Sequence, residues 1–494
     1  MRTHVTKAVF LDALDCPRRA WRAHREEREE ADPLAPDYES TFRTWQGNEI
    51  HTRARAALGA GVMLPSGAVA DAARATQSAL TDASIPVLFE ATFTAHGCVA
   101  RADAIRRVGT SWEVIEVKSA KTPEDGKPAK DYVDDLAYTV LVAEGAGLSV
   151  SSATLMLVNR DYRLERDAIV PFFGTVDATV AVRKQVREFA AVVESLGSVV
   201  LGPNEPDALL TLACRGCAHF GVDCLGVGIP DPLFDLPRLS AKKLDALAPY
   251  ERISRIPRDA DLTANQRRVA AAVWRGEAIV DIAELARLDA LAYPLLFLDF
   301  ESISTAVPFF PATPPHQQVA FQYSLHRVAR PGLAPEQLAF LAETGADWRE
   351  TLFARLCADL GETGTIFSYS PFETQIIRGI GEMLPHHAAT CEALVARIVD
   401  LEPIVRTGWV HPAFRGRSSI KKVLPVVDPA LSYDGLAIGE GGAASSAFAL
   451  MQAGRLPGSA HAGIRTALLT YCEQDTLAMV KVHARLQAER ARSE

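Results

Sequence analysis

The strongest constraint on the fold is a continuous apolar run, YPLLFLDFES at residues 293–302, which ends in acids. An uninterrupted run of this kind is typical of a strand buried on both faces of a sheet. Alternating strand and helix patterns follow it, up to a helix expected around residues 463–490. The sequence therefore predicts an α/β domain of roughly 200 residues, an ordinary domain size.

Acidic side chains recur within this predicted domain. Asp299 and Glu301 are two residues apart, so they share one face of the strand, and strand ends are where α/β folds place their sites. Near the C-terminus, LLTYCEQDT places Tyr471 and Asp475 on one face of a helix. Glu373 lies between them in the run SPFETQ. An ordinary acidic strand terminus is the alternative interpretation of the first pair.

This order, D-x-E early and Y-x3-D on a late helix, resembles the DnaQ-like 3′–5′ exonucleases of the DEDDy type. The resemblance implies an RNase H-like fold in which four acids bind two metal ions and the tyrosine positions the attacking water. The acids would be Asp299, Glu301, Glu373 and Asp475, and the tyrosine would be Tyr471. That family usually has aspartate where this chain has Glu373, and Mg²⁺ tolerates little change in geometry.

The same segment, residues 293–485, also resembles a bacterial family catalogued only as a domain of unknown function. The runs that carry this resemblance are FLDFES, FQYSLH, SPFE, SIKKVLP and YCEQDT. The basic residues around SIKKVLP either contact phosphate or form a solvated helix start. They are Arg415, Arg417, Lys421 and Lys422.

A second set of candidates lies in the N-terminal half. Glu116 and Lys118, in IEVKSAK, point to the same face of a predicted strand, and Asp103 precedes them in ARADAIRR. Carboxylates and a lysine at a sheet edge can hold a divalent cation and activate water. An exposed cross-strand ion pair is the simpler interpretation. Upstream, WQGNEIH places His51 four residues after Gly47 on a predicted helix.

The order G-x3-H, Asp, E-x-K resembles the PD-(D/E)XK nucleases of the RecB type. The resemblance implies a restriction-endonuclease-like fold in which His51, Asp103 and Glu116 bind the metal. Lys118 would orient water or offset developing charge. Tyr138, on the helix after the lysine strand, and Glu90, in LFEATF, are further candidates near this site.

Three cysteines form a C-x2-C-x6-C run, Cys214, Cys217 and Cys224, which needs a fourth ligand to close a tetrahedral site. Cys16 precedes the N-terminal acids, and this one-before, three-after arrangement resembles the CRISPR-adaptation and AddB nucleases. The resemblance implies a [4Fe–4S] cluster held by the four thiolates. Four thiolates also suit Zn²⁺. The remaining cysteines are expected to be core residues.

Composition limits the class of protein. The 494 residues carry a net charge of −9, which argues against a protein that coats nucleic acid electrostatically. The N-terminus has no apolar core ending in small residues, and no long uncharged apolar run follows, so we expect neither a signal peptide nor a membrane helix. We expect a cytoplasmic protein in which thiols stay reduced.

Together these patterns predict an α/β chain in three parts: a nuclease domain with its four-cysteine cluster at 1–228, a helical connector at 229–290 and a DnaQ-like domain at 291–494. The predicted function is Mg²⁺- or Mn²⁺-dependent hydrolysis of DNA, as single strands or ends, in repair, recombination or defence. A nucleic-acid-binding scaffold with an inactive head, and an exonuclease that acts on RNA, are the alternatives.

Overall fold

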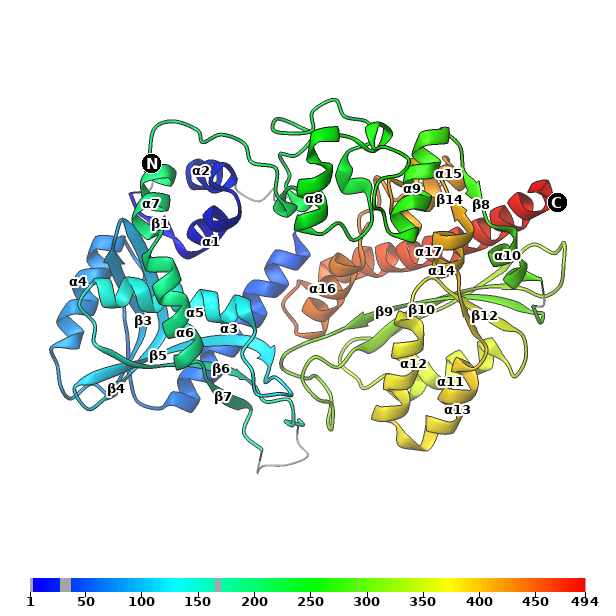
Figure 1. Ribbon diagram of the computed structural model, residues 1–494. Helices are drawn as coiled ribbons and strands as arrows, with labels where there is room; N and C mark the ends of the chain where they lie inside the picture. The colour runs from blue at the N-terminus through cyan, green and yellow to red at the C-terminus, as the bar shows by residue number, and fades with distance from the viewer. Residues whose placement is uncertain (1–2, 27–36, 165–169, 290, 494) are drawn as a thin grey trace. The chain divides into compact units, whose positions relative to one another are not determined.

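The computed structural model describes residues 3–26, 37–164, 170–289 and 291–493 (Figure 1). The chain divides into two compact units, and each combines helices with sheets. The first unit contains residues 1–36, 43–213 and 305–316, and the second contains residues 37–42, 214–304 and 317–494. The three-part division predicted from sequence remains a prediction.

A seven-stranded mixed sheet forms the centre of the first unit. Its order is β2-β3-β4-β5-β6-β7, and β1 pairs with β4. The strands are β1 (Val5–Thr6), β2 (Val62–Met63), β3 (Val87–Ala95), β4 (Cys98–Val108), β5 (Ser111–Lys121), β6 (Val150–Val158) and β7 (Phe173–Asp177). β3, β4 and β5 are antiparallel neighbours, whereas β5 and β6 are parallel and joined by the crossover helix α5 (Lys130–Gly145).

Helices cover both faces of this sheet (Figure 1). Leu88 and Val114 point into a core shared with α1 and α5, and Phe89 and Ile115 point into a core shared with α3. This is the alternation expected of strands buried on both sides. The remaining helices of the unit are α1 (Lys7–Asp15), α2 (Pro17–Arg25), α3 (Tyr38–Leu58, from residue 43 on), α4 (Val69–Leu80), α6 (Thr179–Ala190) and α7 (Val193–Leu201).

The alternation breaks at one point in β3. Leu88 and Ala91 face the same core, although an odd number of positions separates them. Between them Glu90 has a positive φ of 59°, which is uncommon for a residue other than glycine. Asp103 lies opposite it, since Phe89 pairs with Ala104 and Ala91 with Ala102. Such strained positions concentrate at functional sites because the backbone re-aims a side chain there.

The second unit contains a five-stranded sheet with the order β11-β10-β9-β12-β13. Its strands are β9 (Leu295–Ile303), β10 (Val319–Val328), β11 (Glu336–Leu341), β12 (Thr365–Ser368) and β13 (Ile398–Asp400). β9 is the central strand, antiparallel to β10 and parallel to β12. The buried central strand predicted from the apolar run is confirmed, although it continues to Ile303 rather than ending at the acids.

The last helix, α17 (Gly458–Ser493), lies along one face of this sheet, and α11 (Arg349–Leu360), α12 (Phe372–Met383) and α13 (Ala388–Val395) lie on the other side (Figure 1). Leu295 and Phe297 pack against Met479 and Val482 of α17, and Phe297 stacks on Phe367 at 5.0 Å. Burying one such phenylalanine contributes about 1.5–3 kcal/mol. The odd-numbered face of β9 therefore faces α17.

The rest of the second unit consists of short helices and a small sheet in which β14 (Trp409–Val410) pairs with β8 (Ile279–Val280). Its helices are α8 (Ala241–Leu247), α9 (Ala264–Arg275), α10 (Ile282–Leu285), α14 (Leu401–Gly408), α15 (Ile420–Val427) and α16 (Gly441–Gln452). A capping box in which Thr263 and Gln266 bond reciprocally starts α9. Among the described helices, none combines the length and the apolar character needed to cross a membrane.

Candidate functional site

An acidic cavity lies between β9 and α17 in the second unit. Asp299 and Glu301 occupy the odd-numbered face of β9, and Asp475 lies on the face of α17 that also carries Met479. One carboxylate oxygen from each of the three acids lies within 4.8 Å of the others. The strand period and the helix period therefore bring together acids that are more than 170 residues apart in sequence.

Glu373 completes the set of predicted acids. It lies in the first turn of α12 and accepts a hydrogen bond from Ser370 Oγ at 3.3 Å. It lines a cavity of about 450 Å³ together with Asp299, Tyr471 and Asp475. A second cavity of about 340 Å³ shares these four residues and adds Glu301. All five residues predicted for this site are therefore brought to one place.

The acids of this cavity hold their protons unusually tightly. Burial, followed by the charges of neighbouring acids, raises the pKa of Asp299 and Glu301 well above the usual range. Burial also raises the pKa of Glu373 to about 8 and that of Asp475 to about 6. Several carboxylates crowded into a low-dielectric cavity need a compensating positive charge, and Mg²⁺ and Mn²⁺ prefer such oxygen ligands. The residues therefore fit a divalent cation.

Two aromatic hydroxyls and a lysine lie beside the acids. Burial raises the pKa of Tyr471 and Tyr433 well above the usual range, so both remain hydrogen-bond donors at neutral pH. Tyr433 donates to Asp475 Oδ1 at 2.5 Å. Lys421 Nζ lies 5.2 Å from the Tyr433 ring centroid and 5.3 Å from that of Tyr471.

Tyr433 was not predicted from sequence, because it lies in a loop without a repeating pattern, SYDGLAIGEGG. Cys472, expected only as a core residue, is fully buried and directs its thiol to Asp299 Oδ2 at 3.3 Å. Its sequence position next to Tyr471 was the only available signal. Both residues hold acids of the cavity in place.

The other polar residues of this region have different surroundings. Asp400 caps α14 by accepting a hydrogen bond from the Glu402 amide at 2.9 Å. Arg415 pairs with Asp235 at 2.9 Å. Among the four basic residues singled out around SIKKVLP, Lys421 alone lines an acidic cavity, the one of about 450 Å³. Lys422 is exposed at the start of α15.

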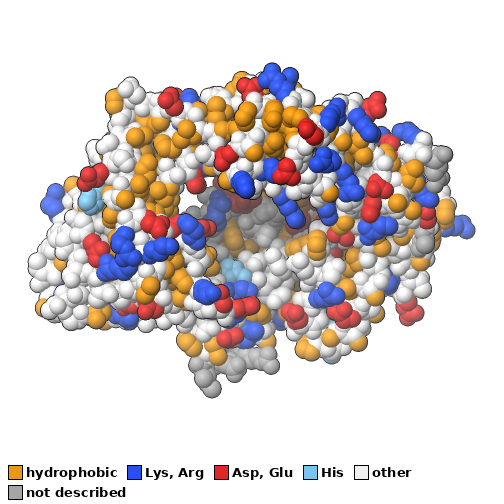
Figure 2. All heavy atoms as spheres, in the orientation of Figure 1, with side chains coloured by type: hydrophobic (Ala, Val, Ile, Leu, Met, Phe, Trp, Pro, Cys, Tyr) orange, Lys and Arg blue, Asp and Glu red, His pale blue; other side chains and the backbone are white. Residues whose placement is uncertain are grey.

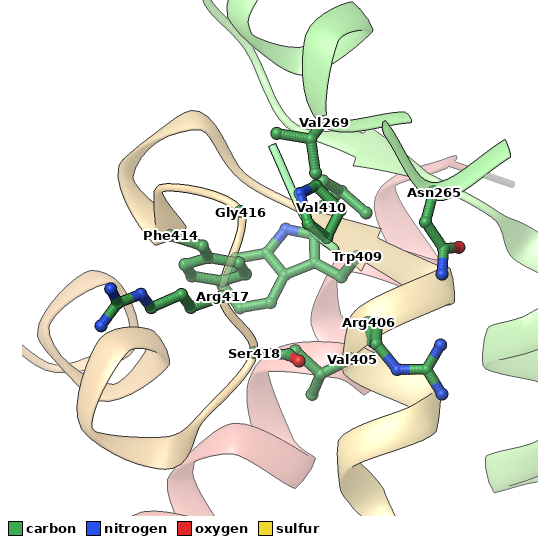
Figure 3. A pocket seen from close by; sticks show the side chains of 11 residues that line it. Asn265, Val269, Val405, Arg406, Trp409, Val410, Phe414, Gly416, Arg417 and Ser418 are labelled. Atoms are coloured by element: carbon green, nitrogen blue, oxygen red, sulfur yellow. The ribbon is translucent and has the colours of Figure 1, made fainter. Parts of the chain in front are cut away.

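Arg417 belongs to a separate small pocket of about 40 Å³, shown in Figure 3. Trp409 and Phe414 form its apolar wall at a ring distance of 5.0 Å, and Asn265 and Val269 approach from α9. This volume suits one or two water molecules and no larger ligand. Its lining contains no acid, so it offers none of the chemistry of the acidic cavity.

The first unit contains a second polar cluster. His51 of α3, Glu90 of β3 and Asp103 of β4 each place a ligand atom within 4.8 Å of the other two. Asp103 Oδ2 accepts a hydrogen bond from the Val117 amide at 2.7 Å, which fixes it beside β5. Glu90, a subsidiary candidate in the sequence, is therefore a full member of this cluster.

Glu116 lies next to this cluster and forms two ion pairs. Its Oε1 contacts Lys7 Nζ at 2.6 Å and Lys118 Nζ at 2.9 Å. Lys118 also pairs with Asp135 of α5. Glu116 Oε2 is buried and has no hydrogen-bond partner among the described residues. A buried carboxylate oxygen without a partner is costly, and a cation would satisfy it.

The electrostatics shift the pKa values of Asp103 and of the neighbouring Glu116 in opposite directions. Burial and the negative charge of Glu116 raise the pKa of Asp103 to about 7. Burial opposes ionisation of Glu116 too, but Lys7 and Lys118 outweigh it and lower the pKa of that carboxyl. Burial lowers the pKa of His51, so its imidazole is neutral and able to bind a metal at neutral pH.

Lys7 was missed because it precedes its partner Glu116 by 109 positions, at the first position of α1. Tyr138 has a structural role in this chain. Its hydroxyl donates to the carbonyls of Val5 at 2.7 Å and Val99 at 3.1 Å, inside the core that joins α5 to β1 and β4.

The cysteines are distributed over both units. Cys16 caps α2, and Cys214, Cys217 and Cys224 belong to the second unit, where the Cys217 amide donates to the Cys214 carbonyl. In the described ranges, no close grouping of metal-ligating side chains contains a cysteine. The four-cysteine site remains a prediction.

A family model described as "Domain of unknown function (DUF2779)" matches residues 296–419. The match lies inside the segment 293–485 and runs from the second residue of β9 past β14, so it includes Asp299, Glu301 and Glu373. It ends before Tyr471 and Asp475. No curated protein matches the chain.

Proposed function

We propose that the chain is a metal-dependent nuclease with two active sites, which hydrolyses phosphodiesters of DNA as single strands or ends. The observation that carries this proposal is the convergence of Asp299, Glu301 and Asp475 within 4.8 Å, in a cavity that Glu373 also lines. Acids at this density are poorly suited to a structural role, because each raises the cost of ionising the others.

In the second site, the four acids would hold Mg²⁺ or Mn²⁺. The bound ions supply charge neutralisation and Lewis acidity for phosphodiester hydrolysis. Tyr471 keeps its proton and orients the attacking water, while Tyr433 fixes the carboxylate of Asp475. Lys421 would offset the negative charge of the substrate phosphate at the cavity wall.

In the first site, His51, Glu90, Asp103 and Glu116 are the ligand set. Lys118 would orient the attacking water or offset charge that develops on phosphate. When the metal is absent, the positive charge of Lys7 offsets the negative charge of Glu116. The partnerless oxygen of Glu116 and the neutral imidazole of His51 support a cation here, because each offers a lone pair without losing an existing hydrogen bond.

The finer fold assignment belongs to the same proposal. A sheet ordered β3-β4-β5 with a crossover through α5 to β6 supports a restriction-endonuclease-like first unit. A central strand that carries two acids, faced by a last helix that carries Tyr471 and Asp475, supports an RNase H-like second unit.

We also propose that Cys16, Cys214, Cys217 and Cys224 bind a [4Fe–4S] cluster, with Zn²⁺ as the alternative occupant. Support comes from the contacts of α2. Arg18 and Arg22 of this helix pair with Glu205 at 2.9 Å and 2.5 Å, and the Trp21 indole donates to the Gly202 carbonyl. These contacts fasten the helix that begins at Cys16 to the segment that leads toward Cys214.

Nucleic acid would be recognised locally, at the two sites. Figure 2 shows acidic and basic side chains interspersed over the face in view, in keeping with a net charge of −9. Lys421 in the second site and Lys118 in the first supply positive charge beside the acids. Binding through a few phosphate contacts has a shallow dependence on salt.

The test is digestion of end-labelled single-stranded DNA, duplex DNA and RNA with Mg²⁺ or Mn²⁺. We expect wild-type chain to release labelled products, Glu116→Gln to remove one activity and Asp299→Asn the other. If the wild type shifts DNA in a gel but digests no substrate with either ion, the chain is a scaffold. Digestion of RNA alone by the second site would make RNA its substrate.

A further inference from the structure

A third group of ligating side chains lies in the second unit. Glu350 is in the first turn of α11, and His386 and His387 belong to the short helix η6 (Pro385–His387) between α12 and α13. His386 Nε2 lies 2.9 Å from Glu350 Oε1, and His387 Nε2 lies 2.9 Å from Glu350 Oε2. None of the three residues lines the acidic cavities.

The two imidazoles are oriented in advance. The His387 ring packs against Phe353 of α11 at 4.7 Å, and Leu384 at the start of η6 is buried. The two histidine rings lie 4.1 Å apart at an angle of 47°. Both Nε2 atoms therefore face one carboxylate, and a potential ligand atom of each residue lies within 4.8 Å of the others.

Without a metal ion, each Nε2 lies at hydrogen-bond distance from one oxygen of the Glu350 carboxylate. A neutral imidazole that carries its proton on Nδ1 has a free Nε2 lone pair, which is the form that binds a cation. Hydrogen bonds from His387 and the nearby charge of His386 lower the pKa of Glu350, so its carboxylate is ionised.

We propose that Glu350, His386 and His387 bind a divalent transition metal of the Zn²⁺ class. Two imidazole nitrogens and a carboxylate suit Zn²⁺, whereas Mg²⁺ and Ca²⁺ prefer oxygen ligands. His386 is 61% exposed and Glu350 is 55% exposed at the side chain, so the ion enters from solvent and a fourth position stays open. This inference does not rest on the proposed nuclease activity.

The site would sit at the far end of α12 from the acidic cavity. Glu373 is in the first turn of α12, and η6 follows its last turn. Twelve helical residues span about 18 Å. A metal ion here would fasten the α12–α13 turn to α11, away from the reacting phosphate.

The experiment is Zn²⁺ titration of the full chain by calorimetry, with excess Mg²⁺ present to occupy the carboxylate sites. We expect His386→Gln/His387→Gln and, separately, Glu350→Gln to lose one equivalent of Zn²⁺ or to bind it at least about 10–100-fold more weakly. His96→Gln is the matched control, because His96 faces a single acid, Glu194, at 3.7 Å.

Glu350→Gln keeps the His387 packing against Phe353, so it tests binding even if the double variant is unstable. Far-UV circular dichroism and melting temperature without Zn²⁺ confirm that each variant is folded. Equal Zn²⁺ stoichiometry and affinity in wild type and a folded Glu350→Gln variant would overturn the proposal. The same loss in His96→Gln would also overturn it.

Discussion

Removing the charge of Glu373 should stabilise the metal-free protein, and increasingly so as pH rises. Its carboxyl is 3% exposed, and burial raises its pKa from 4.5 to about 8. The folded state therefore binds a proton more tightly than the unfolded state. The stability of the wild type consequently falls as pH rises from 4.5 to 8, and the whole penalty is present above pH 8.

The full penalty corresponds to about 4–5 kcal/mol. Glutamine cannot ionise but must bury an amide, which Ser370 partly satisfies, so we expect Glu373→Gln to gain about 2–4 kcal/mol at pH 9. For a unit of this size that raises the melting temperature by roughly 5–10 °C. At about pH 5 the two proteins should melt together, because the wild-type carboxyl is protonated there.

Scanning calorimetry in EDTA between about pH 5 and 9 measures this difference. Glu362→Gln is the control, since Glu362 is exposed and should show no pH-dependent gain. Saturating Mn²⁺ should stabilise the wild type more than Glu373→Gln, because the ion binds the folded state alone. If Glu373→Gln melts below the wild type at pH 9 in EDTA, the buried charge of Glu373 does not destabilise the metal-free folded state.

Three further predictions concern other residues. Lys7→Met should move the acid limb of first-site cleavage to higher pH by about one unit, because Lys7 lowers the pKa of Glu116. A pH–rate profile of protein with the second site inactivated measures this shift, and Lys7→Arg should behave like the wild type. Tyr433→Phe should weaken Mn²⁺ binding at the second site about tenfold, since it removes a hydrogen bond that lowers the pKa of Asp475. Equal Mn²⁺ affinity of variant and wild type in a titration would show that Tyr433 does not support metal binding by Asp475. The wild type should be brown, and Cys214→Ala should remove the colour and lower the melting temperature. If the wild type, purified without air, is colourless and contains stoichiometric zinc, the four cysteines bind Zn²⁺ and no iron–sulfur cluster.

Sequence periodicity located the central strand and the last helix because their apolar patterns are long. The two-residue spacing of Asp299 and Glu301 and the four-residue spacing of Tyr471 and Asp475 each specify one face of one element. They do not specify that the two faces meet. That depends on α17 packing along β9, which is a tertiary arrangement.

The roles of residues outside regular patterns could not be predicted from the sequence. Tyr433 reaches Asp475 from an irregular loop, and Lys7 reaches Glu116 across more than 100 positions. Strand alternation alone does not reveal the positive φ of Glu90, which accompanies its place beside Asp103. The sequence indicates Tyr138 as a candidate near the first site, whereas its hydroxyl bonds to backbone carbonyls in the core.

The contact between Glu350 and the two histidines was equally hidden. Glu350 and the two histidines after α12 carry no periodic signal, and an adjacent His–His pair in sequence is usually a solvated turn. Only the packing of α11 beside η6 brings the carboxylate to both imidazoles. Contacts of this kind follow from the fold and cannot be read from spacing.

We propose that this chain hydrolyses phosphodiesters at two separate acidic sites. The most direct measurement compares the wild type, Glu116→Gln, Asp299→Asn and the double variant on end-labelled single-stranded DNA with Mn²⁺. We predict that each single variant keeps part of the activity and that the double variant, still folded, releases no product. Undiminished cleavage by the folded double variant would show that neither acidic site hydrolyses DNA.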